Sequence, residues 1–152
     1  MRILFVCMGN ICRSPVVEAV ARQRFARAGL DIAVDSAGTA AYHIGARPDA
    51  RALASALAHG YDASTHRGRE VIAADFRNFD ALLVMDRINH RALADYFSPE
   101  QMRRVDLFLP FANIGKPVEV PDPYSGSARD FERVIELAEL GVDGLIAKFK
   151  HP

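Results

Sequence analysis

The chain has 152 residues, a length typical of one domain. Lys and Arg number 19, and Asp and Glu also number 19, so the formal charge is zero and a broad electrostatic attraction to nucleic acid or anionic lipid is not expected. The longest apolar runs, residues 3–8 and 81–85, are far shorter than the ~20 residues that span a bilayer, so we expect a soluble cytoplasmic protein.

Apolar runs that predict buried strands alternate along the chain with stretches of helical periodicity. A strand at residues 3–6 is followed by a helix that begins at Ser14-Pro15, with the proline at the first helical position, and closes at Gly29. The next expected elements are a strand at residues 32–37, a helix at 48–58, a strand at 81–85 and a helix at 87–96.

The last part of the chain predicts one more strand and one more helix. The strand covers residues 105–109, and a proline-rich loop follows it. Ser127 and Asp130 resemble a capping box at the start of the final helix, whose apolar periodicity is weakened by two glycines.

Strands that alternate with helices indicate an α/β fold with three layers, in which helices cover both faces of an open, mostly parallel sheet. The chain contains no linker or internal repeat, so we expect residues 1–152 to form a single domain. In such sheets a ligand binds beyond the carboxyl ends of the strands. The loop from Cys7 to Ser14 follows the first strand and is therefore the leading candidate for the site.

The chain has only two cysteines, Cys7 and Cys12. A secreted disulfide framework needs more cysteines, and a zinc site needs a second pair of ligands at metal-binding spacing. The close pair therefore indicates either thiol chemistry or two small core residues.

The residues around Cys7 favour thiol chemistry. A loop between a strand and a helix directs successive backbone N–H groups toward one point, where they and the helix dipole attract an anion. Gly9 and Asn10 tolerate the tightly turned backbone of such a loop, and we expect the same field to lower the pKa of the Cys7 thiol. Arg13 supplies a planar fork that can bind two oxygens of a tetrahedral anion, and the Ser14 hydroxyl can donate to the thiolate. An isolated cysteine is more simply interpreted as a core residue, but the complete arrangement reverses that preference.

Residues 7–15 resemble the N-terminal phosphate-binding signature of the low-molecular-weight protein tyrosine phosphatases, and Asp122-Pro123-Tyr124 resembles the family's Asp-Pro-aromatic signature. Weaker matches in family order are residues 36–39, Gly45 with Asp49 and Arg51, Ser64 with His66, and Met85-Asp86 with Asn89. The resemblance implies a four-stranded parallel sheet with the phosphate-binding loop after its first strand. It also implies a cysteine-dependent hydrolase that removes phosphate from phosphotyrosine without a metal ion or other cofactor.

The resemblance implies three catalytic residues. Cys7 is the nucleophile that forms a cysteinyl-phosphate, Arg13 binds the phosphate oxygens, and Asp122 is the acid that protonates the departing phenolate. Pro121 and Pro123 flank this aspartate and stiffen its loop. The alternative for Asp122 is a turn residue whose side chain bonds to the backbone two residues later; the loop around Cys7 favours the acid.

The other predicted site residues form the walls and supports of the pocket. Substrate binding is predicted for Met8, Gly9, Asn10, Ile11, Cys12, Ser14, Tyr42 and Tyr124, and a supporting role for His66 and Asp86. The two tyrosines can flank a flat aromatic leaving group, although the family often has Trp in place of Tyr42. Cys12 is close enough to Cys7 in the loop to suggest a reversible bond that protects an oxidised nucleophile.

Three other functions fit part of this pattern. A protein arginine phosphatase of the same fold is disfavoured, without being excluded, by Tyr124 and by Ile11, because relatives that hydrolyse phosphoarginine tend to carry Thr in place of Ile11. An arsenate reductase of this fold needs further cysteines, and none follows Cys12. A phosphotyrosine-binding module without catalysis would lack the nucleophile or the acid. We expect a monomer that acts on phosphotyrosine proteins, with a bacterial tyrosine kinase as one candidate substrate, and that has no nucleic-acid or membrane partner.

Overall fold

The computed structural model describes residues 1–152. Its sheet contains four parallel strands in the order β2-β1-β3-β4. The strands are β1 at Arg2–Cys7, β2 at Ala33–Gly38, β3 at Ala81–Val84 and β4 at Val105–Leu107. In the register of the sheet, Cys7 lies opposite Gly38, and Val6 lies opposite Val84. The expected four-stranded parallel sheet is confirmed.

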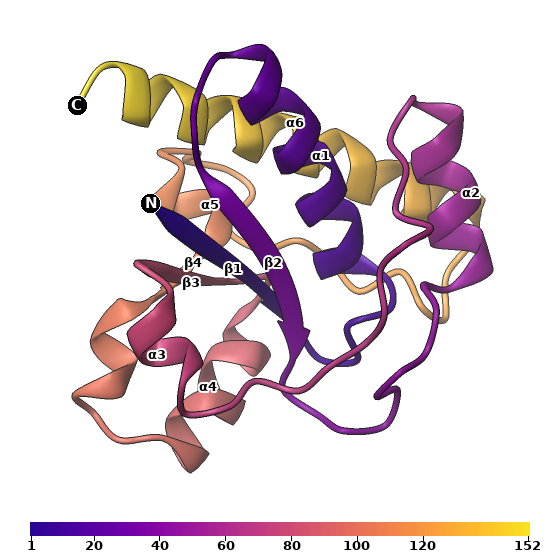
Figure 1. Cartoon of the computed structure of the whole chain (residues 1–152). Coiled ribbons are helices and arrows are strands. Elements are labelled where there is room, and N and C mark those ends of the chain that lie inside the picture. Colours follow the sequence, from indigo (N-terminus) through magenta and orange to yellow (C-terminus); the bar gives the residue numbers. More distant parts are fainter.

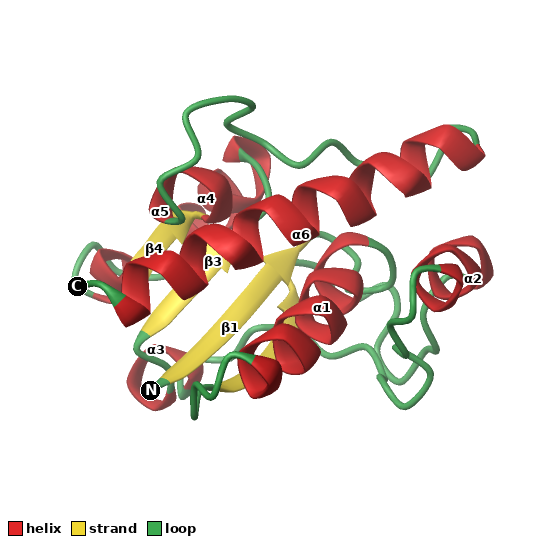
Figure 2. Cartoon of the chain, turned by 90° about the horizontal axis from the view of Figure 1, so that it is seen from above, coloured by secondary structure: helices red, strands yellow, loops and turns green.

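Helices cover both faces of this sheet (Figure 1, Figure 2). One side carries α1 (Arg13–Arg27), α2 (Ala50–Ala58), α5 (Phe108–Phe111) and α6 (Ala128–Lys150); the other carries α3 (Asp75–Asn78) and α4 (Arg87–Tyr96), and the short 3-10 helix η1 (Gln101–Arg104) precedes β4. Alternate residues of a strand point to opposite faces. Ile3 and Phe5 therefore pack in the larger core under α1 and α6, whereas Leu4 and Val6 pack in the smaller core under α3 and α4. The predicted three-layer α/β/α architecture is confirmed.

The first helix begins slightly earlier than predicted. α1 starts at Arg13 with Cys12 at its N-cap, so Pro15 occupies the third helical position rather than the first. The missing N–H of a proline costs nothing there, because the first-turn N–H groups have no intrahelical partner. At the other end, Gly29 adopts a φ of 72° and donates its N–H to the Ala26 carbonyl, which is the closing role expected for a glycine.

Side chains cap the starts of α2 and α6. Asp49 accepts a hydrogen bond from the Arg51 N–H, so α2 begins at Ala50, two residues later than predicted. Ser127 and Asp130 form the capping box that the sequence predicts for α6.

The fourth strand is shorter than predicted and is followed by a buried helical turn. The predicted strand at residues 105–109 ends at Leu107, where α5 begins. An apolar run of this length cannot distinguish a strand from a buried helix. Phe108 of α5 packs against Gly141 of α6, where an added Cβ would overlap its ring. A Cβ added at Gly144 would likewise overlap the backbone carbonyl of Ala112, which follows α5. The two glycines that weaken the predicted helix therefore allow α5 to approach it.

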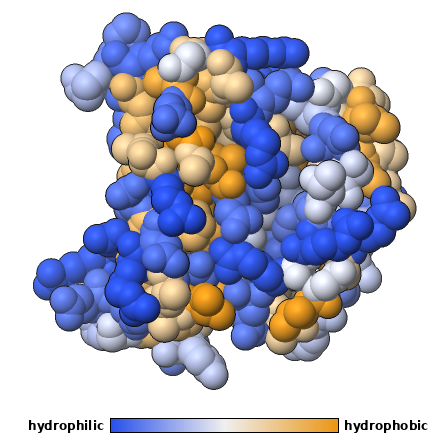
Figure 3. Space-filling model, viewed as in Figure 1, coloured by the Kyte–Doolittle hydropathy of each residue, from blue (hydrophilic) through white to orange (hydrophobic).

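The topology places the end of β1 at the centre of the molecule. The chain adds β2 on one side of β1 and then β3 on the other, which creates a crevice beyond the carboxyl ends of β1 and β3. Cys7 ends β1 at this crevice, and Asp86 follows β3. No helix is both long and apolar enough to cross a bilayer, and Figure 3 shows the hydrophobic side chains of one face in separate patches among hydrophilic ones.

Candidate active site

The loop between β1 and α1 is folded around the sulfur of Cys7. The Cys7 Sγ lies 2.9 Å from the Ser14 hydroxyl oxygen, and both side chains are buried. Asn10 donates from its Nδ2 to that same hydroxyl oxygen at 2.8 Å. Because Ser14 accepts from Asn10, its own hydrogen is free to point at the sulfur, where it stabilises a thiolate.

Asn10 fixes the shape of this loop through its backbone conformation and its hydrogen bonds. Its φ of 59° is left-handed, a conformation that Asn tolerates better than most residues. Its side chain also donates to Ser36 (3.1 Å) and accepts from the Arg69 N–H (3.0 Å). The backbone carbonyl of Asn10 accepts from His66 Nε2 at 3.0 Å. The predicted supporting residue His66 thus contacts the loop directly.

A buried carboxylate completes the support behind His66. Glu18 of α1 lies 3.6 Å from His66 Nδ1 and accepts from the Ser36 hydroxyl at 2.6 Å. Burial opposes ionisation of Glu18, but hydrogen bonds from His66, Ser36 and Arg22 outweigh it and lower the pKa of Glu18. Glu18 has no role among the residues predicted from the sequence, because a glutamate within a helix carries no local signal for such a contact.

Arg13 is held behind the loop by a carboxylate and a carbonyl. Its side chain is only 4% exposed, and Nη1 donates to Asp86 at 2.6 Å and to the Val120 carbonyl at 2.9 Å. Burial opposes its charge, but the nearby Cys7 and the hydrogen-bonded Asp86 outweigh burial and raise the pKa of Arg13. The guanidinium is therefore a fixed positive charge beside the sulfur, and Asp86 lies where a supporting residue was predicted.

Asp122 lines the same cavity as the loop residues and lies close to Arg13. Its Oδ2 is 3.8 Å from Arg13 Nη2, and its side chain is 42% exposed. Its Oδ1 accepts from the Tyr124 N–H at 3.0 Å. The turn contact and the position in the cavity occur together, so the two interpretations of this residue are compatible.

The cavity at this crevice has a volume of about 150 Å³. Its lining residues come from the loop, from the segment after β2 and from the segment before α6: Cys7, Met8, Gly9, Ile11, Cys12, Arg13, Tyr42, His43, Asp122 and Tyr124. Tyr42 is 81% exposed and Tyr124 54%, so both stand at the mouth. Two predicted substrate-binding residues, Asn10 and Ser14, do not line the cavity; their side chains support the loop from beneath.

Cys12 stays a neutral thiol in this arrangement. Burial, followed by the negative charges of Asp49 and the neighbouring Cys7, raises the pKa of Cys12 to about 12. A thiol with so high a pKa attacks an oxidised sulfur slowly at neutral pH. The structure therefore lends no support to the predicted protective bond to Cys7, although both residues line the same cavity.

Arg51 links three parts of the site that are far apart in the sequence. It pairs with Asp49 at 3.0 Å and donates to the Tyr124 carbonyl at 2.9 Å. Its guanidinium also lies over the rings of Tyr124 (5.6 Å) and Phe131 (4.6 Å). The Asp49 N–H donates to the Ile11 carbonyl at 2.8 Å, so the start of α2 connects the Cys7 loop to the segment that carries Asp122.

Arg51 and His43 belong to the site, although neither was given a role from the sequence. Arg51 was noted only as a weaker match in family order with Gly45 and Asp49, and such a match does not reveal its contact with Tyr124. His43 lies beside Gly9, with its ring 3.0 Å from where a Cβ on that glycine would be. Nothing in the sequence around His43 marks it as a wall of the cavity.

Comparisons with known proteins agree with this geometry. The family model for low molecular weight phosphotyrosine protein phosphatase matches residues 2–152. The low molecular weight phosphotyrosine protein phosphatase of Schizosaccharomyces pombe is 40% identical over 134 residues, which cover 86% of this chain and 85% of that protein. A protein tyrosine phosphatase structure from Entamoeba histolytica superposes with a TM-score of 0.92 at 38% identity, covering 99% of this chain and 97% of that one. The arginine phosphatase YwlE also superposes, with a TM-score of 0.91 at 25% identity over 99% of this chain and 97% of that one.

Proposed function

Because the chain belongs to the low molecular weight phosphotyrosine protein phosphatase family, we propose that Cys7, Arg13 and Asp122 carry out its reaction. The chain is a cysteine-dependent protein tyrosine phosphatase. The observation that carries the residue assignment is that a thiol, a buried guanidinium and a carboxyl group line one cavity at the carboxyl end of β1.

In the first step, the Cys7 thiolate attacks the phosphorus of phosphotyrosine opposite the tyrosine oxygen. An S–P bond forms while the P–O bond to the tyrosine breaks. Arg13 and the N–H groups of the loop hold the phosphate oxygens as charge develops on them. Protonated Asp122 gives its proton to the departing phenolate, which leaves as neutral tyrosine.

In the second step, water hydrolyses the cysteinyl-phosphate. Asp122, now a carboxylate, accepts a proton from the water as the water oxygen bonds to phosphorus. The S–P bond breaks and inorganic phosphate leaves. The Ser14 hydroxyl, 2.9 Å from the sulfur, stabilises the thiolate that is released and so makes Cys7 a better leaving group.

The walls of the cavity favour an aromatic leaving group. Ile11 lines it with an apolar side chain, and Tyr42 and Tyr124 stand at its mouth. Aromatic pairs contribute about 0.5–1.5 kcal/mol beyond simple burial. A phosphoarginine guanidinium would instead leave N–H donors without partners against Ile11, which costs free energy. The arginine phosphatase alternative is therefore less well supported.

Kinetics with small and peptide substrates test these roles. We expect turnover of p-nitrophenyl phosphate without added metal, no turnover by Cys7→Ser, and a loss of about 10²–10⁴-fold in kcat for Asp122→Ala. Phosphotyrosine peptides should be hydrolysed in preference to phosphoarginine peptides. Sustained turnover by Cys7→Ser, or a preference for phosphoarginine, would overturn the proposal.

We also propose a cellular location, an oligomeric state and a class of substrate for the protein. We place it in the cytoplasm, because the proposed nucleophile must stay a reduced thiol and both cysteines are free. Residues 1–152 would act as one monomeric phosphatase domain on phosphotyrosine proteins, with a bacterial tyrosine kinase as one candidate substrate. The balanced charge of the chain supports the absence of a nucleic-acid or membrane partner.

A further inference from the structure

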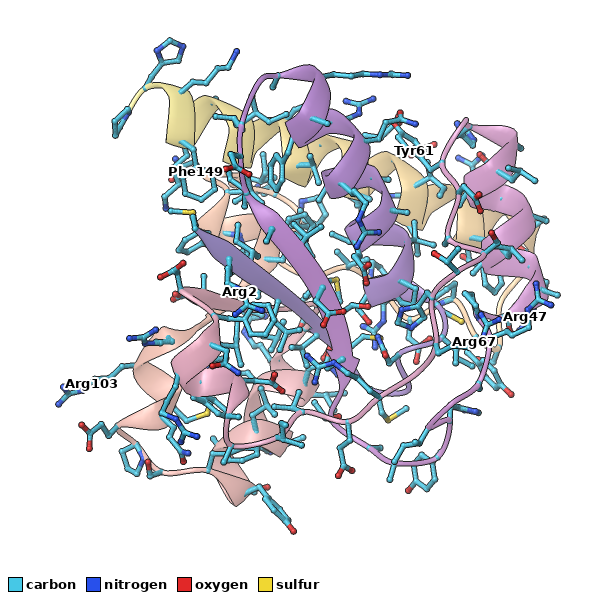
Figure 4. All side chains as sticks on the ribbon, in the orientation of Figure 1. Arg2, Arg47, Tyr61, Arg67, Arg103 and Phe149 are labelled. Carbon is cyan, nitrogen blue, oxygen red and sulfur yellow. The ribbon has the colours of Figure 1, made fainter.

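Two arginines, Arg47 and Arg67, lie side by side next to the cavity. The backbone segments that carry them are joined by two hydrogen bonds, one from the Gly68 N–H to the Ala46 carbonyl and one from the Gly45 N–H to the Gly68 carbonyl, each 2.8 Å long. Both arginines are exposed, and Figure 4 shows them at the same corner of the molecule, below α2. They form one surface feature although they lie 20 positions apart in the chain.

The segments that carry the two arginines are bonded to the phosphate-binding loop through neighbouring residues. Arg67 lies between His66 and Arg69, which both bond to Asn10 of that loop, at 3.0 Å each. Arg47 lies two residues before Asp49, whose N–H bonds to the loop carbonyl of Ile11 at 2.8 Å.

The cavity wall itself is part of the same structure. The carbonyl of His43, a residue that lines the cavity, packs directly against the backbone of Gly68. The segments that carry the arginine pair therefore adjoin a wall of the cavity.

The charges of the two arginines are not neutralised within the protein. Arg47 forms no hydrogen bond or ion pair, and Arg67 bonds only to backbone carbonyls, those of Ser64 at 3.0 Å and His66 at 2.7 Å. Both bonds use Nη1 of Arg67, so they fix the direction of the side chain and leave its Nη2 and Nε free.

The nearby carboxylates are already engaged elsewhere. Asp49 pairs with Arg51, and Asp35 and Asp75 pair with Arg69. Asp62 accepts from the Ser64 N–H. Glu70 lines a separate groove with Thr39 and Tyr96, so it does not face the pair.

We propose that Arg47 and Arg67 bind an acidic side chain that flanks the phosphotyrosine of a protein substrate. This inference rests on the proposed function and adds a preference among its substrates. The formal charge of the chain is zero, so an acidic sequence gains from this local pair rather than from the field of the whole molecule.

Matched peptides test the inference. One series moves a single Glu through the residues on either side of the phosphotyrosine, and a second series carries Gln at the same places. The readout is the ratio of kcat/KM between each Glu peptide and its Gln partner. Turnover of p-nitrophenyl phosphate, which has no flanking residues, normalises each variant for loss of folded enzyme.

We expect wild type to prefer Glu at one or more positions, by about two- to fivefold per arginine as for typical exposed ion pairs, and to lose this preference at high salt. The ratio should fall in Arg47→Gln and in Arg67→Gln, and approach one in the double variant. Arg103→Gln is the matched control, because Arg103 is exposed on the opposite side of the molecule (Figure 4) and should leave the ratio unchanged.

Three results would overturn the inference: a wild-type ratio of one at every position, a ratio that survives in the double variant, or an equal fall in Arg103→Gln. A wild-type enzyme that hydrolyses neither p-nitrophenyl phosphate nor any phosphotyrosine peptide would overturn the proposed function, and this inference with it. The two failures are therefore distinguishable.

Discussion

Replacing Asp86 tests how the guanidinium of Arg13 is held in place. Asp86 is 15% exposed and accepts from Arg13 at 2.6 Å. It also accepts from the Asn89 N–H at 2.8 Å and so caps α4. Asp86→Asn keeps a good capping side chain but removes the charge, whereas Asp86→Ala removes both. The two variants therefore separate the ion pair from the cap.

The expected effects follow from the partners that would be left. Without the Asp86 charge, Arg13 retains the Val120 carbonyl at 2.9 Å and the more distant Asp122 at 3.8 Å. We expect Asp86→Asn to lower the free energy of unfolding by about 1.5–3 kcal/mol, the contribution of a hydrogen bond to a charged group. Asp86→Ala should lower it by about 1 kcal/mol more, for the lost cap. Both should reduce kcat/KM, because a guanidinium without its carboxylate is less well aimed at the phosphate.

Urea unfolding monitored by circular dichroism, with p-nitrophenyl phosphate kinetics on the same samples, measures both effects. Asp95→Asn is the control, since Asp95 is an exposed residue of α4 without an ion pair. An Asp86→Asn protein within about 0.5 kcal/mol of wild type, the usual range for a surface change, would refute the reasoning. So would an Asp86→Ala protein as stable as Asp86→Asn.

Four further outcomes are expected. Iodoacetamide at pH 9 should modify Cys7 and spare Cys12, because a pKa of about 12 leaves about one Cys12 thiolate in a thousand; peptide mass mapping that finds Cys12 modified first would contradict this. The pH dependence of kcat for aryl phosphates should be bell-shaped with an acidic optimum, and Asp122→Asn should lose its alkaline limb; an unchanged profile would exclude this residue as the acid. Arg51→Met should lower kcat more for phenyl phosphate than for p-nitrophenyl phosphate, because the poorer leaving group depends more on a well-placed acid; equal losses would show that Arg51 does not position it. The lowered pKa of Glu18 means that its stabilising contribution is present above the ordinary Glu pKa of about 4.3 and is lost as the pH falls through the folded value; acidification should therefore destabilise wild type more than Glu18→Gln in urea unfolding, and equal losses would count against it.

Local signals account for the parts of the fold that the sequence predicts well. The run at residues 3–6, the glycine that closes α1 and the capping box of α6 each depend on residues within a few positions of one another. Each of these features is present in the structure. The strand predicted at residues 105–109 was too long, because burial makes a strand and a short helix equally apolar.

The parts of the site that escaped prediction are contacts between distant segments. Arg51 reaches Tyr124 across 73 positions, and His66 reaches Asn10 across 56. His66 was placed only through the family resemblance, and Arg51 was given no role. The juxtaposition of Arg47 with Arg67 likewise depends on backbone pairing between two irregular segments, where no periodicity exists to reveal it.

The close packing of α5 against α6 means that a change at their contact can move the distant end of α6. A methyl group at Gly141 would have to displace the Phe108 ring or tilt the helix, because the added carbon would overlap that ring. Phe131 lies under the Arg51 guanidinium. It is ten residues earlier in α6, which is about 15 Å along the helix axis. A tilt of α6 at Gly141 would therefore move Phe131, and with it Arg51 and the segment that carries Asp122. A substitution at Gly141, which is buried and distant from the reacting atoms, should for this reason impair turnover.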